Sequence, residues 1–287
     1  MPNDPIATMT KEKGTLKVAL LQLSATQDSR SNLDKALSMS REAIAQKAKF
    51  ILLPEVFNYR GDTKDKGVLA KVTEIIPGPS TEAFVALAKR CKVSFLLGSI
   101  LEKATDSKAY NSSVLIDPQG KITAKYRKIH LFDALIGEKW IKESDTFRPG
   151  RRPATAKLGD FKVGLSICYD LRFPSLYQEY AHNGVDVLAV PSCFTRKTGI
   201  PHWEVLLRAR AIENLAYVLA PDQVGTDSRG IQAHGHSMII SPWGEIIARG
   251  SGDRQEIVFG EIELEEVQKA RRMLPGVITG GRHDKKN

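Results

Sequence analysis

The chain has 287 residues, of which 42% are hydrophobic, and its mean hydropathy of −0.24 is typical of a water-soluble globular protein with a substantial core. No stretch approaches the roughly 18 to 20 apolar residues that a membrane-spanning helix needs, so we expect no membrane partner. The net charge of +9 is spread along the chain without a recognisable nucleic-acid-binding motif, which indicates a solvated basic surface and argues against a nucleic-acid partner.

The N-terminal residues 1–14 are polar and lack the apolar run of a secretory signal, so we expect a disordered lead there. Three cysteines, Cys91, Cys168 and Cys193, form an odd and sparse set that does not close into disulfide pairs. Such a set fits a reducing compartment, and we expect a cytoplasmic protein. The sequence contains no Cys-x-x-Cys or His-Glu-x-x-His motif, so it predicts no metal site.

In the first half of the chain, short apolar runs alternate with segments of helical periodicity. We expect strands at residues 16–23, 50–53, 93–100, 110–116 and 121–128, and helices at 31–46 and 81–92. The last two strands are separated by the breakers Asp-Pro-Gln-Gly at 117–120, which predict a hairpin turn.

Predicted strands and helices also alternate in the second half of the chain. We expect strands at residues 161–167, 185–190, 217–220, 237–240, 245–248 and 257–262, and helices at 174–183, 202–214 and 264–272. Because hairpins interrupt the alternation of strands and helices, the sheets should be mixed rather than purely parallel. We therefore expect one α/β domain over residues 15–277, followed by a basic tail over 278–287.

Three reactive side chains come at the ends of predicted strands. Glu55 follows the strand at 50–53, Lys128 ends the strand at 121–128, and Cys168 follows the strand at 161–167. Each has an ordinary explanation, because a cysteine is often core filling, a glutamate can cap a helix and a lysine is usually solvated. Loops at the carboxyl ends of strands nevertheless tend to carry the chemistry of α/β proteins.

Together these three groups supply what amide hydrolysis needs. A free thiol has a pKa of about 8.5 and needs a neighbouring base or cation to act as a nucleophile at neutral pH. Glu55 could take the thiol proton and return it to the leaving group. Lys128 and the backbone N–H of Tyr169 could stabilise the oxyanion of the tetrahedral intermediate.

These residues lie in longer motifs that resemble those of the nitrilase superfamily of carbon–nitrogen hydrolases. Its three catalytic motifs are matched, in chain order, by Leu53-Pro54-Glu55, Tyr126-Arg127-Lys128-Ile129-His130-Leu131-Phe132-Asp133 and Ile167-Cys168-Tyr169-Asp170-Leu171-Arg172-Phe173-Pro174. The segments at 198–204, 208–214 and 234–238 match further motifs of the family. The resemblance covers nearly the whole chain.

The resemblance implies a four-layer α-β-β-α sandwich with two mixed β-sheets, which assembles into a homodimer or a higher homo-oligomer. It also implies no metal or organic cofactor and a Glu–Lys–Cys triad. In that triad Glu55 is the proton acceptor, Lys128 the oxyanion and proton donor, and Cys168 the nucleophile. A second glutamate of the family motif corresponds to Glu143, which we expect to orient Lys128 and the substrate amide. The intervening residues 134–142 differ from the sequence that is usual in the family.

Within the superfamily, the motifs resemble most those of amidases that act on deaminated glutathione or, as ω-amidases, on α-ketoglutaramate. We therefore expect an amidase that converts a small 2-oxoglutaramate-like amide, with deaminated glutathione favoured, to a carboxylate and ammonia through a thioester acyl-enzyme, as a step of metabolite repair. Arg172 is the candidate for binding a substrate carboxylate, and a structural salt bridge is its alternative role. Tyr169, Phe194, Thr195 and Thr198 are further candidates for substrate contacts.

Three other functions remain open at this point. A nitrilase or N-carbamoyl amide hydrolase would use the same triad. A papain-like hydrolase would pair the cysteine with one of His130, His202 and His236, which we expect instead to be hydrogen-bonded scaffold. A non-enzymatic basic binding protein would show salt-sensitive affinity for nucleic acid. We expect Cys193 to lie in the core near the site and Cys91 to be structural.

Overall fold

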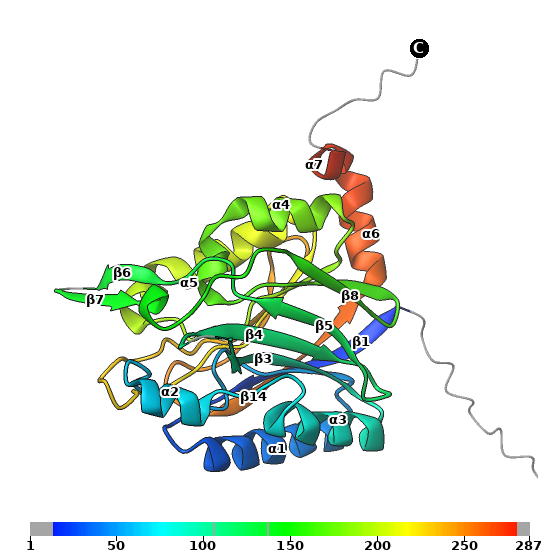
Figure 1. The fold of residues 1–287 in the computed structure, drawn as a ribbon. Helices are drawn as coiled ribbons and strands as arrows, with labels where there is room; N and C mark the ends of the chain where they lie inside the picture. The colour runs from blue at the N-terminus through cyan, green and yellow to red at the C-terminus, as the bar shows by residue number, and fades with distance from the viewer. Residues whose placement is uncertain (1–13, 106, 137, 280–287) are drawn as a thin grey trace, which may run out of the picture.

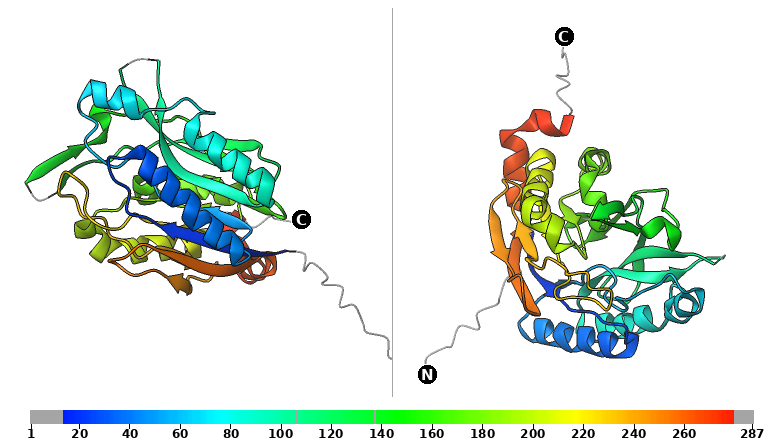
Figure 2. Two further views of the ribbon diagram at one scale, coloured as in Figure 1. Left: turned by 90° about the horizontal axis from the view of Figure 1, so that it is seen from below. Right: turned by 90° about the vertical axis from the view of Figure 1, so that its left-hand side faces the viewer.

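Two six-stranded β-sheets are stacked face to face and covered by helices on both outer sides (Figures 1 and 2). The computed structural model describes residues 14–105, 107–136 and 138–279. The predicted N-terminal lead, apart from Gly14, and the predicted tail from residue 280 onward lie outside these described residues. The four-layer α-β-β-α sandwich with mixed sheets is confirmed.

The first sheet has the strand order β14-β1-β2-β3-β4-β5. Its strands are β1 (Thr15–Gln22), β2 (Phe50–Leu52), β3 (Ser94–Lys103), β4 (Ala109–Ile116), β5 (Ile122–Arg127) and β14 (Glu256–Glu263). Strands β1, β2 and β3 run parallel, whereas β14, β4 and β5 join their neighbours in antiparallel pairs. Helices α1 (Ser29–Ala45) and α3 (Pro79–Cys91) cover its outer face.

The second sheet has the order β13-β12-β11-β10-β9-β8. Its strands are β8 (Ala154–Leu158), β9 (Phe161–Leu165), β10 (Val187–Ala189), β11 (Tyr217–Ala220), β12 (Met238–Ile240) and β13 (Ile246–Arg249). The central strands β9, β10 and β11 are parallel. Helices α4 (Pro174–His182) and α5 (Arg196–Asn214) cover its outer face, and α6 (Leu264–Met273) and α7 (Pro275–Thr279) follow β14 (Figure 1).

The alternation of side chains along β1 explains why an almost continuous apolar run forms a strand here. Val18 and Leu20 face the second sheet and join the larger hydrophobic cluster between the sheets. Ala19 and Leu21 face the opposite way and pack under α1 and α3. Because both faces of the sheet are buried, the strand needs apolar residues at successive positions.

Several elements differ from the sequence prediction. Helix α2 (Lys66–Val72), strand β8 and the hairpin of β6 (Asp133–Ile136) and β7 (Lys139–Lys142) were not predicted. The hairpin projects from the body of the protein (Figure 1), and no residue of β6 is buried, so the sequence there lacks the apolar signal of a strand with one buried face. Among the described residues, no helix is both long enough and apolar enough to cross a bilayer.

The predicted start of helix α5 was wrong. The helix begins at Arg196, six positions before the predicted start at His202, and continues through Pro201. A proline is usually found in the first turn of a helix, and Pro201 lies just before the predicted start. In the structure the helix accepts an interior proline, which removes one backbone donor.

Candidate active site

A buried lysine lies between two glutamates at one end of the sheets. Lys128 Nζ is 2.8 Å from Glu55 Oε1 and 2.9 Å from Glu143 Oε2. Glu55 directly follows β2 through Leu53 and Pro54, and Lys128 follows β5. Glu143 opens the short 3-10 turn η1 (Glu143–Asp145) that follows the hairpin strand β7, and the backbone N–H of Phe132 donates to its Oε2 at 2.8 Å. The structure thus brings together three of the four predicted catalytic side chains in direct contact.

Every carboxylate oxygen of Glu55 has a donor. Oε1 accepts from Lys128 and, at 2.8 Å, from Asn111 Nδ2, while Oε2 accepts from the backbone N–H of Cys193 at 2.8 Å. The backbone carbonyl of Glu55 accepts from Gln223 Nε2 at 2.9 Å. These donors come from β4, from the position after β5 and from the loops after β10 and β11, so both sheets hold Glu55 in place.

The backbone around Glu55 is tightly packed and locally strained. Val56 adopts a φ of 49°, which a β-branched residue rarely does. In β3, a Cβ added to Gly98 would lie 1.8 Å from the carbonyl oxygen of Leu53, so only glycine permits this approach of β3 to the loop. Strain of this kind persists where the surrounding structure enforces it, and it occurs most often at functional sites.

Cys168 sits on a second strained turn, between β9 and α4. It opens the 3-10 turn η2 (Cys168–Arg172) with a φ of 48°. The buried carboxylate of Asp170 fixes this turn, because it accepts from the N–H of Ile167 at 2.9 Å and from the hydroxyl of Tyr126 at 2.7 Å. Since Tyr126 belongs to β5, the same carboxylate ties the cysteine turn to the strand that delivers Lys128.

The charges of the cluster set the protonation states of the thiol and the lysine. Burial and the charge of Glu55 raise the pKa of the Cys168 thiol well above its ordinary value, although Lys128 opposes this. Burial alone would lower the pKa of Lys128, but the charges of Glu143 and Glu55 outweigh it and raise that pKa well above the ordinary value. Burial also raises the pKa of the Glu143 carboxyl. At neutral pH the site therefore holds a neutral thiol beside an ammonium.

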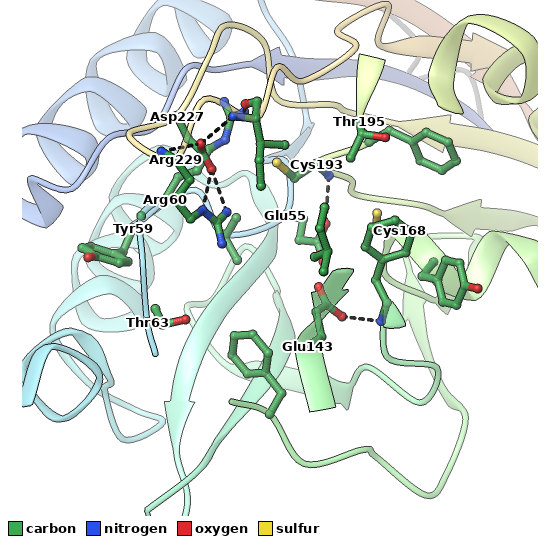
Figure 3. A pocket seen from close by; sticks show the side chains of 18 of the residues that line it. Glu55, Tyr59, Arg60, Thr63, Glu143, Cys168, Cys193, Thr195, Asp227 and Arg229 are labelled. Atoms are coloured by element: carbon green, nitrogen blue, oxygen red, sulfur yellow. Dashed lines mark hydrogen bonds and ion pairs between the residues drawn. The ribbon is translucent and has the colours of Figure 1, made fainter. Parts of the chain in front are cut away.

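The cluster opens into a cavity of about 120 Å³ (Figure 3). Glu55, Glu143 and Cys168 line this inner cavity. The five residues predicted to contact substrate line it as well: Tyr169, Arg172, Phe194, Thr195 and Thr198. The hydroxyls of the two threonines lie 2.8 Å apart and form a hydrogen bond with each other.

Arg172 faces the cavity without an acidic partner. Its guanidinium lies 5.8 Å from the ring centre of Tyr169 and 5.4 Å from that of Phe194, and its Nη2 is 3.2 Å from His202 Nδ1. No carboxylate of the described residues forms an ion pair with it. The alternative role of Arg172 in a salt bridge within the chain is therefore not observed.

The histidines considered for a cysteine–histidine pair are engaged elsewhere. His130 Nδ1 lies 2.7 Å from Asp170 Oδ1, and its ring stacks on Phe173. His236 Nδ1 lies 3.2 Å from the carbonyl oxygen of Gly250. Within the described part of the chain, none of His130, His202 and His236 lines the inner cavity.

The two remaining cysteines differ in position. Cys193 lines the inner cavity, and burial raises the pKa of its thiol to about 12, so it stays protonated at neutral pH. Its backbone N–H, rather than its sulfur, contacts Glu55. Cys91 ends helix α3 on the outer side of the first sheet and packs against the hydrophobic cluster there.

Two residues of the site were missed at the sequence level. Asn111 lies in the apolar strand β4, and a polar side chain in such a run was a usable signal. Arg60 is 2% exposed, lines the inner cavity and donates to the carbonyls of Val224, Gly225 and Ile231. No pattern in the sequence marks Arg60, because its partners lie more than 160 positions away.

Across the described residues, no group of three or more His, Cys, Asp and Glu side chains is arranged to hold a metal ion. The donors around the cavity are instead a lysine, arginines, hydroxyls and backbone N–H groups. This set suits an organic substrate with oxygen acceptors.

Comparison with known proteins gives consistent matches. The sequence profile of the family described as Carbon-nitrogen hydrolase matches residues 17–272. The chain is 38% identical over 262 residues to ω-amidase NIT2 of Homo sapiens, covering 91% of this chain and 93% of that protein.

Two crystal structures share the fold. The NitFhit protein of C. elegans matches with a TM-score of 0.85 and 34% identity, over 94% of this chain and 66% of that one. Nit3 of Saccharomyces cerevisiae, described as a member of branch 10 of the nitrilase superfamily, matches with a TM-score of 0.81 and 32% identity. That match covers 91% of this chain and 95% of Nit3.

Proposed function

The chain belongs to the carbon–nitrogen hydrolase family, the nitrilase superfamily, and from that premise we propose that it hydrolyses the amide of a 2-oxoglutaramate-like substrate with Cys168 as nucleophile. As an amidase of this superfamily it acts on carbon–nitrogen bonds other than peptide bonds. The observation that carries the catalytic proposal is the direct contact of Lys128 with Glu55 and Glu143 in the cavity that Cys168 lines.

In the first half of the proposed reaction, Glu55 takes the proton of the Cys168 thiol while the sulfur attacks the amide carbonyl carbon. The tetrahedral oxyanion lies near the Lys128 ammonium and the backbone N–H of Tyr169, at the start of η2, where N–H groups lack helical partners. Glu55 then passes the proton to the nitrogen, the carbon–nitrogen bond breaks and a thioester forms.

In the second half, water replaces the amine. Glu55 takes a proton from the water, the hydroxide attacks the thioester carbonyl, and the sulfur leaves and recovers the proton. Glu143 holds Lys128 from the other side and offers an acceptor to the amide nitrogen. The raised pKa of Cys168 supports this route, because a thiol that is neutral at rest needs a base at the moment of attack.

Arg172 supports a substrate with a carboxylate next to a ketone. Its guanidinium lines the inner cavity beside Tyr169, and it has no acidic partner among the described residues. A planar guanidinium binds a carboxylate through two parallel hydrogen bonds. The 2-oxo acid end of the substrate would occupy this side, and the amide would lie between Cys168 and Glu143.

Deaminated glutathione remains the favoured substrate, and atom balance corrects one expectation about its product. Its scissile amide nitrogen belongs to cysteinylglycine, so hydrolysis releases that dipeptide and 2-oxoglutarate, not ammonia. Ammonia is the product only when the substrate is a primary amide such as α-ketoglutaramate. The second candidate is this ω-amidase activity, and the 38% identity to an ω-amidase favours it.

A substrate panel tests the proposal and separates the alternatives. We expect wild-type protein to release 2-oxoglutarate from deaminated glutathione or α-ketoglutaramate, and Cys168→Ala to release none. Faster turnover of simple nitriles or N-carbamoyl amino acids would contradict the proposed substrate class. Full activity of Cys168→Ala would contradict the mechanism. Salt-sensitive binding to nucleic acid without any hydrolysis would favour a binding protein instead.

We also propose a homodimer. Large apolar side chains are exposed on the outer side of α5 and on the neighbouring β12–β13 hairpin: Ile200, Val205, Ile212, Trp243 and Ile247. Val205 is 66% exposed, and a contiguous apolar surface is often buried by association. A monomeric mass in sedimentation equilibrium at micromolar concentration would contradict the proposal.

A further inference from the structure

Two buried polar residues join the two sheets beside the proposed catalytic cluster. Asp222 and Gln223 follow β11 through Pro221, and both are fully buried. Gln223 pairs with Leu23 after β1 in an isolated parallel bridge, and Asp222 pairs with Ser192 after β10 in another. Neither Asp222 nor Gln223 is among the described residues that line the inner cavity. Any part they play in the reaction must therefore be exerted through other residues.

Gln223 holds the backbone of Glu55. Its Nε2 donates to the carbonyl of Glu55 at 2.9 Å, and its Oε1 accepts from the backbone N–H of Ala25 at 2.9 Å. Its own backbone N–H donates to the carbonyl of Ser192 at 3.0 Å. Because the side chain uses both ends of its amide, the loop that carries Glu55 is fixed to the loop after β1 and to the segment after β10.

Asp222 holds the segment that presents a donor to the carboxylate of Glu55. Its Oδ1 accepts from the backbone N–H of Phe194 at 2.9 Å and from that of Gln223 at 3.0 Å. Phe194 directly follows Cys193, whose backbone N–H donates to Glu55 Oε2 at 2.8 Å. Asp222 and Gln223 together thus fix both the backbone of Glu55 and the donor to one of its carboxylate oxygens.

The segment at 191–194 also contacts Cys168. The backbone N–H of Cys168 donates to the carbonyl of Pro191 at 2.9 Å. Burial raises the pKa of the Cys168 thiol, and a hydrogen bond from the backbone N–H of Cys193 acts against this rise. The N–H of Cys193 therefore contacts both the carboxylate of Glu55 and the sulfur of Cys168. A shift of this segment would change the separation of the carboxylate and the thiol.

Asp222 supplies its acceptor without adding charge. Burial raises the pKa of its carboxyl well above the ordinary value, against hydrogen bonds from the N–H groups of Phe194 and Gln223, so the carboxyl is neutral at neutral pH. The negative charge of Glu55 also raises this pKa. Among the described residues, none forms a hydrogen bond with Asp222 Oδ2. One neutral acceptor atom, Oδ1, is therefore what this position provides.

We propose that Asp222 and Gln223 are positioning residues, which hold Glu55 where it can take the proton of the Cys168 thiol. This role rests on the proposed function and adds to it the residues through which the second sheet fixes the base. Val56, next to Glu55, has a φ of 49°, and strain of this kind persists only where the surrounding structure enforces it. Loss of a hydrogen bond from the second sheet would let this loop relax, and a displacement of about 1 Å can cost about 100-fold in rate.

Gln223→Met tests the proposal, with Gln22→Met as the matched control. Gln22 is also fully buried and also bridges backbone groups, since its Oε1 accepts from the N–H of Ser237 at 2.9 Å and its Nε2 donates to the carbonyl of Ser251 at 2.8 Å. Methionine is similar in size and removes both hydrogen-bonding ends of the amide. We expect both variants to lose similar stability in urea denaturation, but only Gln223→Met to lose kcat, by about 10- to 100-fold. KM for the amide should change by less than about twofold, because neither glutamine lines the inner cavity.

Asp222→Asn and Asp222→Leu form a second, independent pair, which keeps the proposal testable if Gln223→Met does not fold. Asp222→Asn keeps a neutral acceptor at the position of Oδ1, so it should retain kcat within about threefold. Asp222→Leu leaves the N–H groups of Phe194 and Gln223 without this acceptor and should lose kcat by about 10- to 100-fold. Equal losses of kcat in these two variants, or equal kcat in Gln223→Met and Gln22→Met, would overturn the proposal.

Combining Gln223→Met with Glu55→Gln shows whether Gln223 acts through Glu55. Because the base is already lost in Glu55→Gln, the double variant should be slower than Glu55→Gln by less than about threefold. If the two losses of kcat instead multiply in full, Gln223 acts independently of Glu55 and has no positioning role.

Alkylation of Cys168 by iodoacetamide separates failure of this proposal from failure of the proposed function, because it requires no hydrolysis. Glu55 takes the thiol proton while the sulfur displaces iodide, and peptide mass spectrometry distinguishes Cys168 from the two other cysteines. Slower alkylation in Gln223→Met than in Gln22→Met supports the proposal even if no 2-oxo acid amide is hydrolysed, and then only the proposed substrate class fails. Equal alkylation rates refute the positioning role, while release of 2-oxoglutarate by the wild type leaves the proposed function standing.

Discussion

Replacing Glu55 by glutamine tests the centre of the site with a nearly isosteric change. Both oxygens of this carboxylate are acceptors, Oε1 for Lys128 and Asn111 and Oε2 for the backbone N–H of Cys193. A glutamine offers one oxygen and one NH2 group. In either orientation of the amide, the NH2 group faces another donor, so one buried hydrogen bond is lost without a replacement.

Glu55→Gln should change two quantities, the free energy of unfolding and kcat. A buried donor left without its acceptor costs about 1 to 3 kcal/mol, so we expect Glu55→Gln to lose that much free energy of unfolding. Loss of the general base should reduce kcat by about 100- to 10,000-fold, and in that range the barrier rises by about 3 to 5 kcal/mol.

Urea denaturation measures the loss of free energy of unfolding, and initial-rate kinetics measure the loss of kcat. Glu102→Gln is the matched control. Glu102 is also a buried glutamate, and its carboxylate accepts from Arg127, Lys125 and Ser112 at 2.6 to 2.8 Å. Its replacement should cost similar stability with a rate loss well below about 100-fold, because the base remains. Equal rate losses in Glu55→Gln and Glu102→Gln would refute the assignment of Glu55 as the base.

Three further changes have defined outcomes. Lys128→Met should lower kcat by about 100- to 1000-fold by removing an oxyanion donor, and denaturation should also show lower stability because Glu55 and Glu143 lose their cation. Arg172→Gln should raise KM by about tenfold or more for 2-oxo acid amides and leave KM for a simple aliphatic amide unchanged, because only the former carries a carboxylate. Burial raises the pKa of Glu102, but hydrogen bonds from Arg127, Lys125 and Ser112 outweigh it and lower that pKa from 4.5 to about 2. The ionised Glu102 carboxylate therefore stabilises the fold above pH 4.5, and this stabilisation is lost as the pH falls toward 2. The loss should be about 2 kcal/mol of the free energy of unfolding after allowance for solvent screening. Urea midpoints of the wild type should therefore fall more steeply between pH 4.5 and pH 2 than those of Glu102→Gln.

The proposed catalytic cluster was predictable because each of its central residues lies within three positions of the end of a strand. Glu55 comes three residues after β2, Lys128 immediately after β5, and Cys168 three residues after β9. These strands bring their carboxyl ends to one side of the two stacked sheets, so short connections leave little freedom in where the side chains lie. Motif resemblance added Glu143, for which spacing alone gave no signal.

The outer cavity of about 720 Å³ that adjoins the catalytic one was not predictable from local patterns. Its walls come from the loop at 62–64, the projecting hairpin and the start of α5, which are far apart along the chain. The hairpin lacks a buried face, and the start of α5 is hidden by Pro201. The wrong helix start placed Arg196 and Lys197 in a loop, where two basic residues have no particular meaning.

The charges of the cluster also support the proposed mechanism over that of a cysteine–histidine hydrolase. A cysteine–histidine pair works from a preformed thiolate beside an imidazolium, which lowers the pKa of the thiol. Here burial together with the charge of Glu55 raises the pKa of the Cys168 thiol instead. In the proposed mechanism, transfer of the thiol proton to Glu55 during attack leaves the net charge of the buried cluster unchanged. Negative charge then moves from that carboxylate to the substrate oxygen, and Lys128 stays protonated because Glu143 and Glu55 raise its pKa. The raised pKa of the Cys168 thiol therefore favours proton transfer in step with attack over a resting thiolate.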